Sequence, residues 1–328
     1  MAGGIISVGL QLQGFHIPSL IVLAVAVTGY VILLVLTGWR FVRFRAEMIA
    51  DLIDARHGFR YFTFVAGTNV LAVRSTMSDH HLVAAVLFVV AAAAWGLLGY
   101  MVPWAAILGT TERPVIARAN GTWFIWVVAS QSVAVSAAVL ELVYVDARAI
   151  LAGIAVVSWS VGVFLYAAVG VFVGARMLLY PFGPADLTGP YWVSMGACAI
   201  TVLAGSRIIE MASAPMVEAT RGLIYGLAVL FWAFAAWLIP VLVAAGWWRH
   251  VVKRIPLRYD PSLWSIVFPV GMFAVASIYL GDVEHLPLVR GIGTGTLIVA
   301  VFVWAAALAL LLHHLWCTFV RRSTREQP

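Results

Sequence analysis

The sequence predicts an all-α protein that crosses a membrane many times. Hydrophobic residues make up 63% of its 328 residues and charged residues only 10%, whereas soluble domains carry about 25% charged residues. The mean hydropathy is +1.01. Runs without Asp, Glu, Lys or Arg recur along the chain, and most reach the length of about 20 residues that a helix needs to cross a bilayer. These observations argue against a soluble enzyme and against a disordered chain.

We expect ten helical spans within a single transmembrane domain, 1–320. Eight are clear, and two are weaker because 61–78 is interrupted by Arg74 and 1–14 is too short to span alone. The segment 1–14 lacks the basic start and the cleavage site of a signal peptide, so we interpret it as an N-terminally truncated first helix. The spans lie near 1–14, 17–38, 61–78, 82–108, 121–140, 149–175, 190–211, 217–246, 262–280 and 289–320, and a basic tail follows at 321–328.

The loop charges test this count. With ten spans and a cytoplasmic N-terminus, 15 of the 20 Lys and Arg residues fall on the cytoplasmic side. The other side holds 5, namely Arg74, Arg148, Arg207, Arg221 and Arg290. This bias is typical of membrane proteins and predicts that both termini are cytoplasmic, with the plasma membrane as the location.

Two kinds of span alternate. The even-numbered spans are long and rich in Ala, Val and Leu, whereas the odd-numbered spans carry small or polar residues. Lipid-facing helices gain nothing from such residues, but helices around a narrow or wet path do. We therefore expect five helical hairpins with the odd spans inside around a central pore, although small residues also serve tight helix packing. The candidate pore-lining or kink residues are Gly4, Gly67, Asn69, Ser130, Ser132, Gly196, Pro269 and Gly271.

The predicted interior has almost no charge in mid-span. Arg207 and Glu210, spaced i, i+3, are expected to pair at the membrane interface. The scarcity of mid-span charge argues against a buried carboxylate relay and favours selection by pore size and backbone dipoles.

Other chemistry has little support in the sequence. The adjacent His313 and His314 are the only histidines deep in a span, which does not suit a bis-His haem. Cys198 and Cys317 are interpreted as packed thiols. We predict no enzyme activity, no metal, no cofactor and no nucleic-acid partner.

Four segments carry a family resemblance. They are GGIISVGLQL (3–12), FRYFTFVAGTNVLAVR (59–74), NGTWFIWVVASQSVAV (120–135) and YDPSLWSIVFPVGMFAVAS (259–277). In this order they resemble the tellurite-resistance/dicarboxylate transporter family, which includes plant slow anion channels, fungal malate permeases and fungal sulfite exporters, and the chain is most similar to bacterial members. The resemblance implies ten helices as five hairpins around a pore, assembled as a homotrimer. It also implies that Phe268, immediately before Pro269, plugs the pore.

The predicted function is transport of small anions through a central pore gated by Phe268. Candidate substrates are C4-dicarboxylates, sulfite, tellurite, chloride and nitrate. Two alternatives stay open, a proton-coupled secondary exporter of an organic or oxyanion and a non-transporting, degenerate member of the family.

Overall fold

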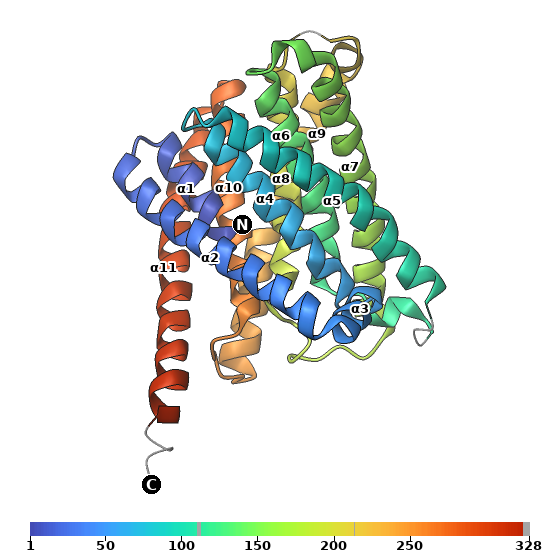
Figure 1. Ribbon diagram of the computed structural model, residues 1–328, viewed down its shortest axis with the longest axis vertical. Helices are drawn as coiled ribbons and strands as arrows, with labels where there is room; N and C mark the ends of the chain where they lie inside the picture. The colour runs from blue at the N-terminus through green and yellow to red at the C-terminus, as the bar shows by residue number, and fades with distance from the viewer. Residues whose placement is uncertain (110–112, 213, 324–328) are drawn as a thin grey trace.

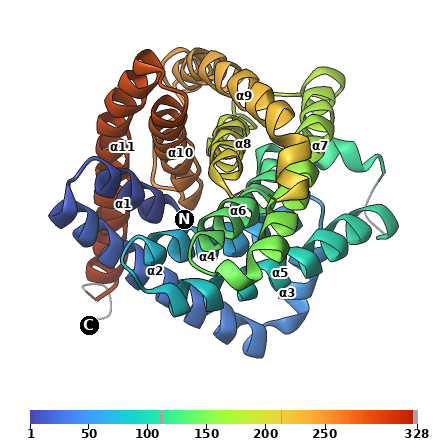
Figure 2. The ribbon, with the colours of Figure 1, turned by 90° about the horizontal axis from the view of Figure 1, so that it is seen from above.

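The computed structural model describes residues 1–328 except 110–112, 213 and 324–328, and it has helices and no strand among the described residues. Five helices are mostly buried, and in Figure 2 they lie towards the middle of the molecule. They are α1 (Ala2–Leu12), α4 (Phe62–Thr76), α6 (Phe124–Glu141), α8 (Val193–Glu210) and α10 (Trp264–Val283).

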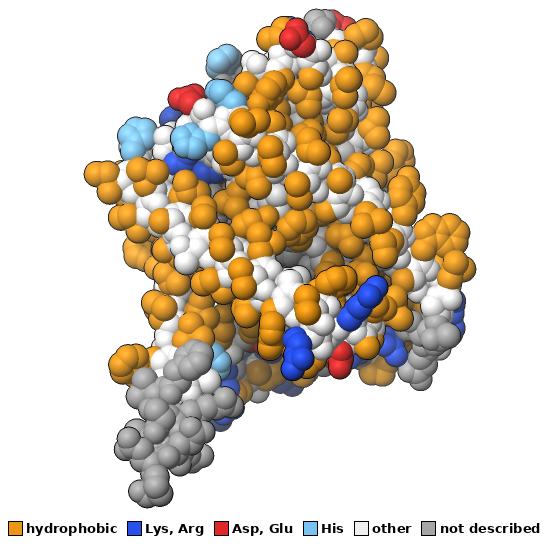
Figure 3. Space-filling model, viewed as in Figure 1, with side chains coloured by type: hydrophobic (Ala, Val, Ile, Leu, Met, Phe, Trp, Pro, Cys, Tyr) orange, Lys and Arg blue, Asp and Glu red, His pale blue; other side chains and the backbone are white. Residues whose placement is uncertain are grey.

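Five longer helices cover the buried ones and present most of the exposed large hydrophobic side chains. In Figure 3 these apolar side chains cover most of the visible face, and Lys and Arg concentrate near its lower edge. Such a surface suits contact with lipid rather than water. The covering helices are α2 (His16–Arg43), α5 (His81–Leu108), α7 (Arg148–Leu179), α9 (Pro215–Trp247) and α11 (Pro287–Ser323).

The contacts between helices follow a simple order. Each buried helix packs against the covering helix that follows it, as α1 does with α2 and α10 does with α11 (Figure 1). The buried helices also contact one another in the closed sequence α1–α4–α6–α8–α10–α1. The predicted alternation of inner and outer helices is therefore present in the packing.

The number of membrane crossings is less clearly marked. Among the residues that the structure describes, eight helical segments are long and apolar enough to cross a membrane, while α1 is shorter, with 11 residues. Helix α4 has 15 residues and follows a four-residue 3₁₀ turn, Gly58–Tyr61. The ten-span arrangement thus stays a prediction, because α1 and α4 fall short of the usual length of a span.

Tight turns begin four of the buried helices at one end of the molecule. The Asn120 side chain accepts a hydrogen bond from the Thr122 N–H before α6, and Asp260 accepts one from the Ser262 N–H before α10. These side chains satisfy amide groups that a helix start leaves unpaired. A methyl group on Gly121 would lie 2.3 Å from the carbonyl carbon of Pro190, so glycine lets two of these turns meet.

The linker between α2 and α4 folds into a short helix, α3 (Arg45–Ile53). Arg40 at the end of α2 pairs with Asp51 of α3 at 2.5 Å. Burial alone would raise the pKa of Asp54, just beyond α3, but the Arg56 N–H and the Arg118 guanidinium hold this pKa below its usual value.

Two charged side chains, Arg74 of α4 and Glu141 of α6, are buried inside the protein. Arg74 was expected at the non-cytoplasmic edge, but it is 1% exposed and lies inside the packing of α1, α2 and α4. Glu141 is fully buried at the end of α6 and pairs with Arg148 at 2.5 Å. Runs of uncharged residues locate spans well, but they do not show whether a charge at the end of a span meets water or protein.

Candidate functional site

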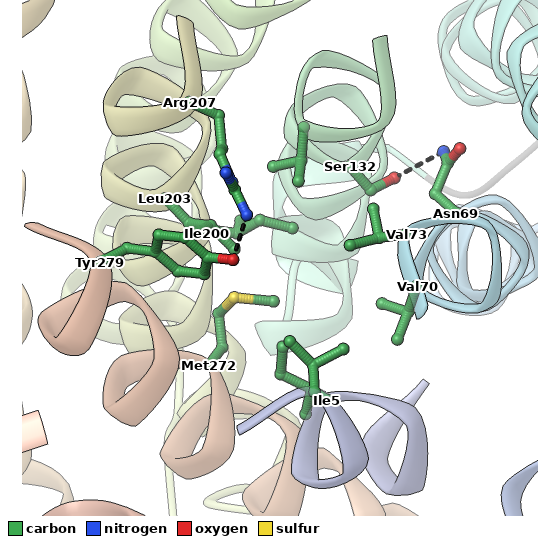
Figure 4. Close-up of a pocket in the computed structure, with 12 residues that line it drawn as sticks. Ile5, Asn69, Val70, Val73, Ser132, Ile200, Leu203, Arg207, Met272 and Tyr279 are labelled. Carbon is green, nitrogen blue, oxygen red and sulfur yellow. Dashed lines mark hydrogen bonds between the residues drawn. The ribbon is translucent and has the colours of Figure 1, made fainter. Parts of the chain in front are cut away.

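A narrow cavity lies between the five buried helices (Figure 4). Its volume is about 30 Å³, which is room for about two water molecules. All five buried helices contribute to its wall. The lining residues are Ile5 and Val8 of α1, Asn69, Val70 and Val73 of α4, Ser132 and Val135 of α6, Ile200, Leu203 and Arg207 of α8, and Met272 and Tyr279 of α10.

The wall formed by α4 and α6 carries two polar side chains. Asn69 donates a hydrogen bond from Nδ2 to Ser132 Oγ at 3.0 Å, and Ser132 in turn donates to the Ala129 carbonyl at 2.7 Å. The Asn69 Oδ1 atom is buried and has no hydrogen-bond partner within the described part of the chain. A buried acceptor without a partner costs about 1–3 kcal/mol, so this atom favours a water molecule beside it.

The opposite wall carries an arginine. Arg207 of α8 lies 3.9 Å from the ring centroid of Tyr279 and donates a hydrogen bond to the Tyr279 hydroxyl (Figure 4). It also pairs with Glu210 at 3.1 Å, as the i, i+3 spacing predicts. The cavity therefore has a cation on its wall, and a carboxylate from the same helix offsets part of that charge.

Phe268 lies one helical turn before the cavity residue Met272. It is fully buried and is not among the residues that line the cavity. Residues at i and i+4 share one face of a helix, so Phe268, Met272 and Tyr279 follow a single stripe along α10. Phe268 therefore lies on the face of α10 that borders the cavity, one helical turn nearer the start of the helix than Met272.

The predicted glycine and proline residues mostly set distances between helices. A methyl group on Gly196 would lie 2.9 Å from Cγ of Pro269, and one on Gly271 would lie 2.8 Å from Cδ1 of Ile6. Real Cβ atoms essentially never approach so closely, so α8 can pack this closely against Pro269 of α10 because Gly196 lacks a Cβ atom, whereas the end of the flexible Ile6 side chain could shift away from a methyl group on Gly271.

Two further glycines and one serine belong to other contacts. A methyl group on Gly4 would lie 2.6 Å from Cγ1 of Val70, whereas one on Gly67 would meet only Met1, at 3.6 Å. Ser130 accepts a hydrogen bond from Trp95 Nε1 of α5 at 2.9 Å. Of the predicted pore residues, the structure thus brings Asn69 and Ser132 together in the cavity wall.

Several cavity residues were missed in the sequence. The spacing of Met272 and Tyr279 from Phe268 was a usable signal, because intervals of four and eleven residues keep one face of a helix. Ile200 and Leu203 looked like ordinary apolar residues of a span. The described residues contain no group of three or more potential metal ligands.

Comparison with known proteins supports transport. Residues 1–312 match the family model SLAC1, described as voltage-dependent anion channel. This match confirms the family resemblance of the four sequence segments. An uncharacterized membrane protein of Mycobacterium tuberculosis is 58% identical over 158 residues, which are 48% of this chain and 80% of that protein. Two uncharacterized transporters of Methanocaldococcus jannaschii are 25% and 24% identical over 152 residues, 46% of this chain and 42% of each relative.

Proposed function

Because the chain belongs to the voltage-dependent anion channel family, we propose that it conducts small anions across the plasma membrane through the central cavity. The observation that carries this proposal is a cavity whose wall is built by all five buried helices. Its lining is mostly apolar and includes Arg207. Such a path disfavours cations at the arginine and holds anions only weakly, as conduction requires.

The proposed arrangement in the membrane has ten crossings. In it α1 and α4 cross as short helices, each forming a hairpin with the covering helix that follows, and both termini are cytoplasmic. The excess of Arg and Lys on the side where α4, α6, α8 and α10 begin supports this orientation. The assembly is a homotrimer with a separate pore in each subunit.

The proposed gate is the ring of Phe268. Pro269 cannot donate a backbone hydrogen bond within α10, so the preceding turn of the helix is weakened at this point. Contact with Gly196 fixes Pro269 against α8. A change in the Phe268 rotamer would then extend the cavity towards the cytoplasmic start of α10 without moving the helices apart.

Conduction is favoured over proton-coupled export. The twelve residues that line the cavity include no carboxylate and no histidine. A coupled exporter needs a proton-carrying group such as a carboxylate or an imidazole along its path. The candidate substrates stay chloride, nitrate, sulfite, tellurite and C4-dicarboxylates, and the larger ones need an opening well beyond the present volume.

The test compares two phenylalanines of α10 in a planar bilayer that holds the purified protein. We expect Phe268→Ala to raise the anion current, because it removes the ring next to the cavity. Phe273→Ala removes an equally buried ring that stacks on Trp232 of α9, and it should not raise the current. Equal currents in the two folded variants would refute the gate, and silence of the folded wild type and of Phe268→Ala would refute conduction.

A further inference from the structure

Arg74 is held in a cluster of neutral oxygen atoms from three parts of the chain. Its guanidinium donates to Ser7 Oγ at 3.0 Å, Gln11 Oε1 at 3.2 Å, Ser19 Oγ at 3.1 Å and Ser78 Oγ at 2.5 Å. We call these five residues the Arg74 cluster. Ser7 and Gln11 belong to α1, Ser19 to α2, and Ser78 follows α4.

The charge of Arg74 is not neutralised by a neighbour. Its side chain is almost completely buried, and among the described residues no carboxylate pairs with it. Arginine does not lose its proton in proteins, so a full positive charge persists here. Hydroxyl and amide oxygens solvate this charge and weaken its field without cancelling it, and a buried charge is screened far less than an exposed one.

The Arg74 cluster lies directly behind the wall of the cavity. Val70 and Val73 on the same helix line the cavity, and so does Val8, the neighbour of Ser7 in α1. Arg74 itself does not line it. On the far wall, the charge of Arg207 is partly offset by Glu210 at 3.1 Å. The field of Arg74 therefore reaches an ion in the cavity through apolar side chains and lacks such an offset.

We propose that Arg74 determines charge selectivity, acting through space to favour small anions over cations without contacting the ion. This inference rests on the proposed function. The hydroxyl and amide groups of the Arg74 cluster hold the guanidinium at a fixed position, so that its field does not vary with side-chain motion. A buried ionisable group inside a membrane protein is costly, and a role in selectivity accounts for keeping one here.

The test neutralises the charge and keeps the arginine. Gln11→Glu is nearly isosteric and places a carboxylate oxygen where Oε1 now accepts from Arg74. Ser78→Asp also places a carboxylate next to the Arg74 guanidinium, at the half-exposed end of the Arg74 cluster. Ser78→Asn is the uncharged control for this variant. The readout is the chloride-to-potassium permeability ratio, taken from reversal potentials in a potassium chloride gradient.

We expect Gln11→Glu and Ser78→Asp each to lower this ratio by about tenfold, the scale of one unit charge acting at close range through a partly buried path. Ser78→Asn should keep the wild-type ratio. An unchanged ratio in folded, conducting Gln11→Glu and Ser78→Asp would overturn the inference, because a purely structural arginine tolerates a carboxylate partner. A wild type that conducts no anion would overturn the proposed function as well, so the two failures are distinguishable.

Discussion

The contact between Gly196 and Pro269 gives a quantitative prediction for Gly196→Ala. The added methyl would lie 2.9 Å from Cγ and 3.1 Å from Cα of Pro269. Carbon atoms pack best at about 3.5–4.0 Å, so α8 and α10 must separate by about 0.5 Å or more. Overpacking of this kind costs about 1–3 kcal/mol. Alanine also favours a helix over glycine by about 1 kcal/mol, which offsets part of that cost.

Gly226→Ala is the matched control, because Gly226 lies on the exposed surface of α9 and an added methyl meets nothing within 4 Å. Gly226→Ala should therefore raise the free energy of unfolding only through the higher helix propensity of alanine. The difference between the two variants in free energy of unfolding, measured by denaturant titration in mixed micelles, should therefore equal the overpacking cost of about 1–3 kcal/mol. Equal stabilities would refute the close approach of α8 and α10.

Three further predictions follow from other contacts. Arg148→Ala leaves the buried carboxylate of Glu141 unpaired and should lower the free energy of unfolding by about 3 kcal/mol. Adding Glu141→Gln should restore part of this lost stability, because the neutral amide is cheaper to bury. No recovery in the double variant would contradict the pairing. The Ser262 side chain lowers the pKa of Asp260, so the ionised carboxylate stabilises the fold above its unfolded pKa, and this contribution is lost as the pH falls through the folded pKa. Asp260→Asn should therefore flatten the dependence of the free energy of unfolding on pH between about pH 5 and 3. An unaltered pH dependence would exclude this role of Asp260. Asn69→Leu removes the amide group from one wall of the cavity. It should lower the single-channel conductance by about fivefold, which corresponds to the loss of one hydrogen bond. An unchanged conductance would place the ion path elsewhere.

The sequence was sufficient to predict which helices are buried. Small and polar residues such as Gly196 and Asn69 mark the inner helices, because a lipid-facing helix has no use for them. It was not sufficient to choose between Ser130 and Ser132. Residues two apart lie about 200° apart on a helix, so only one of these serines can face the cavity, and the sequence does not give the rotation of the helix.

The Arg74 cluster was beyond sequence reasoning for a different reason. Ser7, Gln11 and Ser19 are more than 50 residues from Arg74 in the chain, and they approach it only because α1 and α2 pack against α4. A buried arginine usually pairs with an Asp or Glu that can be sought in the sequence, but the partners of Arg74 are neutral and give no such signal. The role of Phe268 as a gate stays a prediction, since burial next to the cavity is compatible with a plug and with a packing residue.

Chemical modification of a cysteine in the cavity wall tests the ion path most directly. Val73→Cys, made with Cys198 and Cys317 replaced by alanine, places a thiol on the lining of the cavity. Val86→Cys is the control, because the side chain of Val86 is 54% exposed on the outer surface of α5. A membrane-impermeant thiol reagent should reduce the anion current of Val73→Cys and leave that of Val86→Cys unchanged. A current that persists in Val73→Cys after the thiol has reacted completely, as mass spectrometry would verify, would contradict conduction through the central cavity.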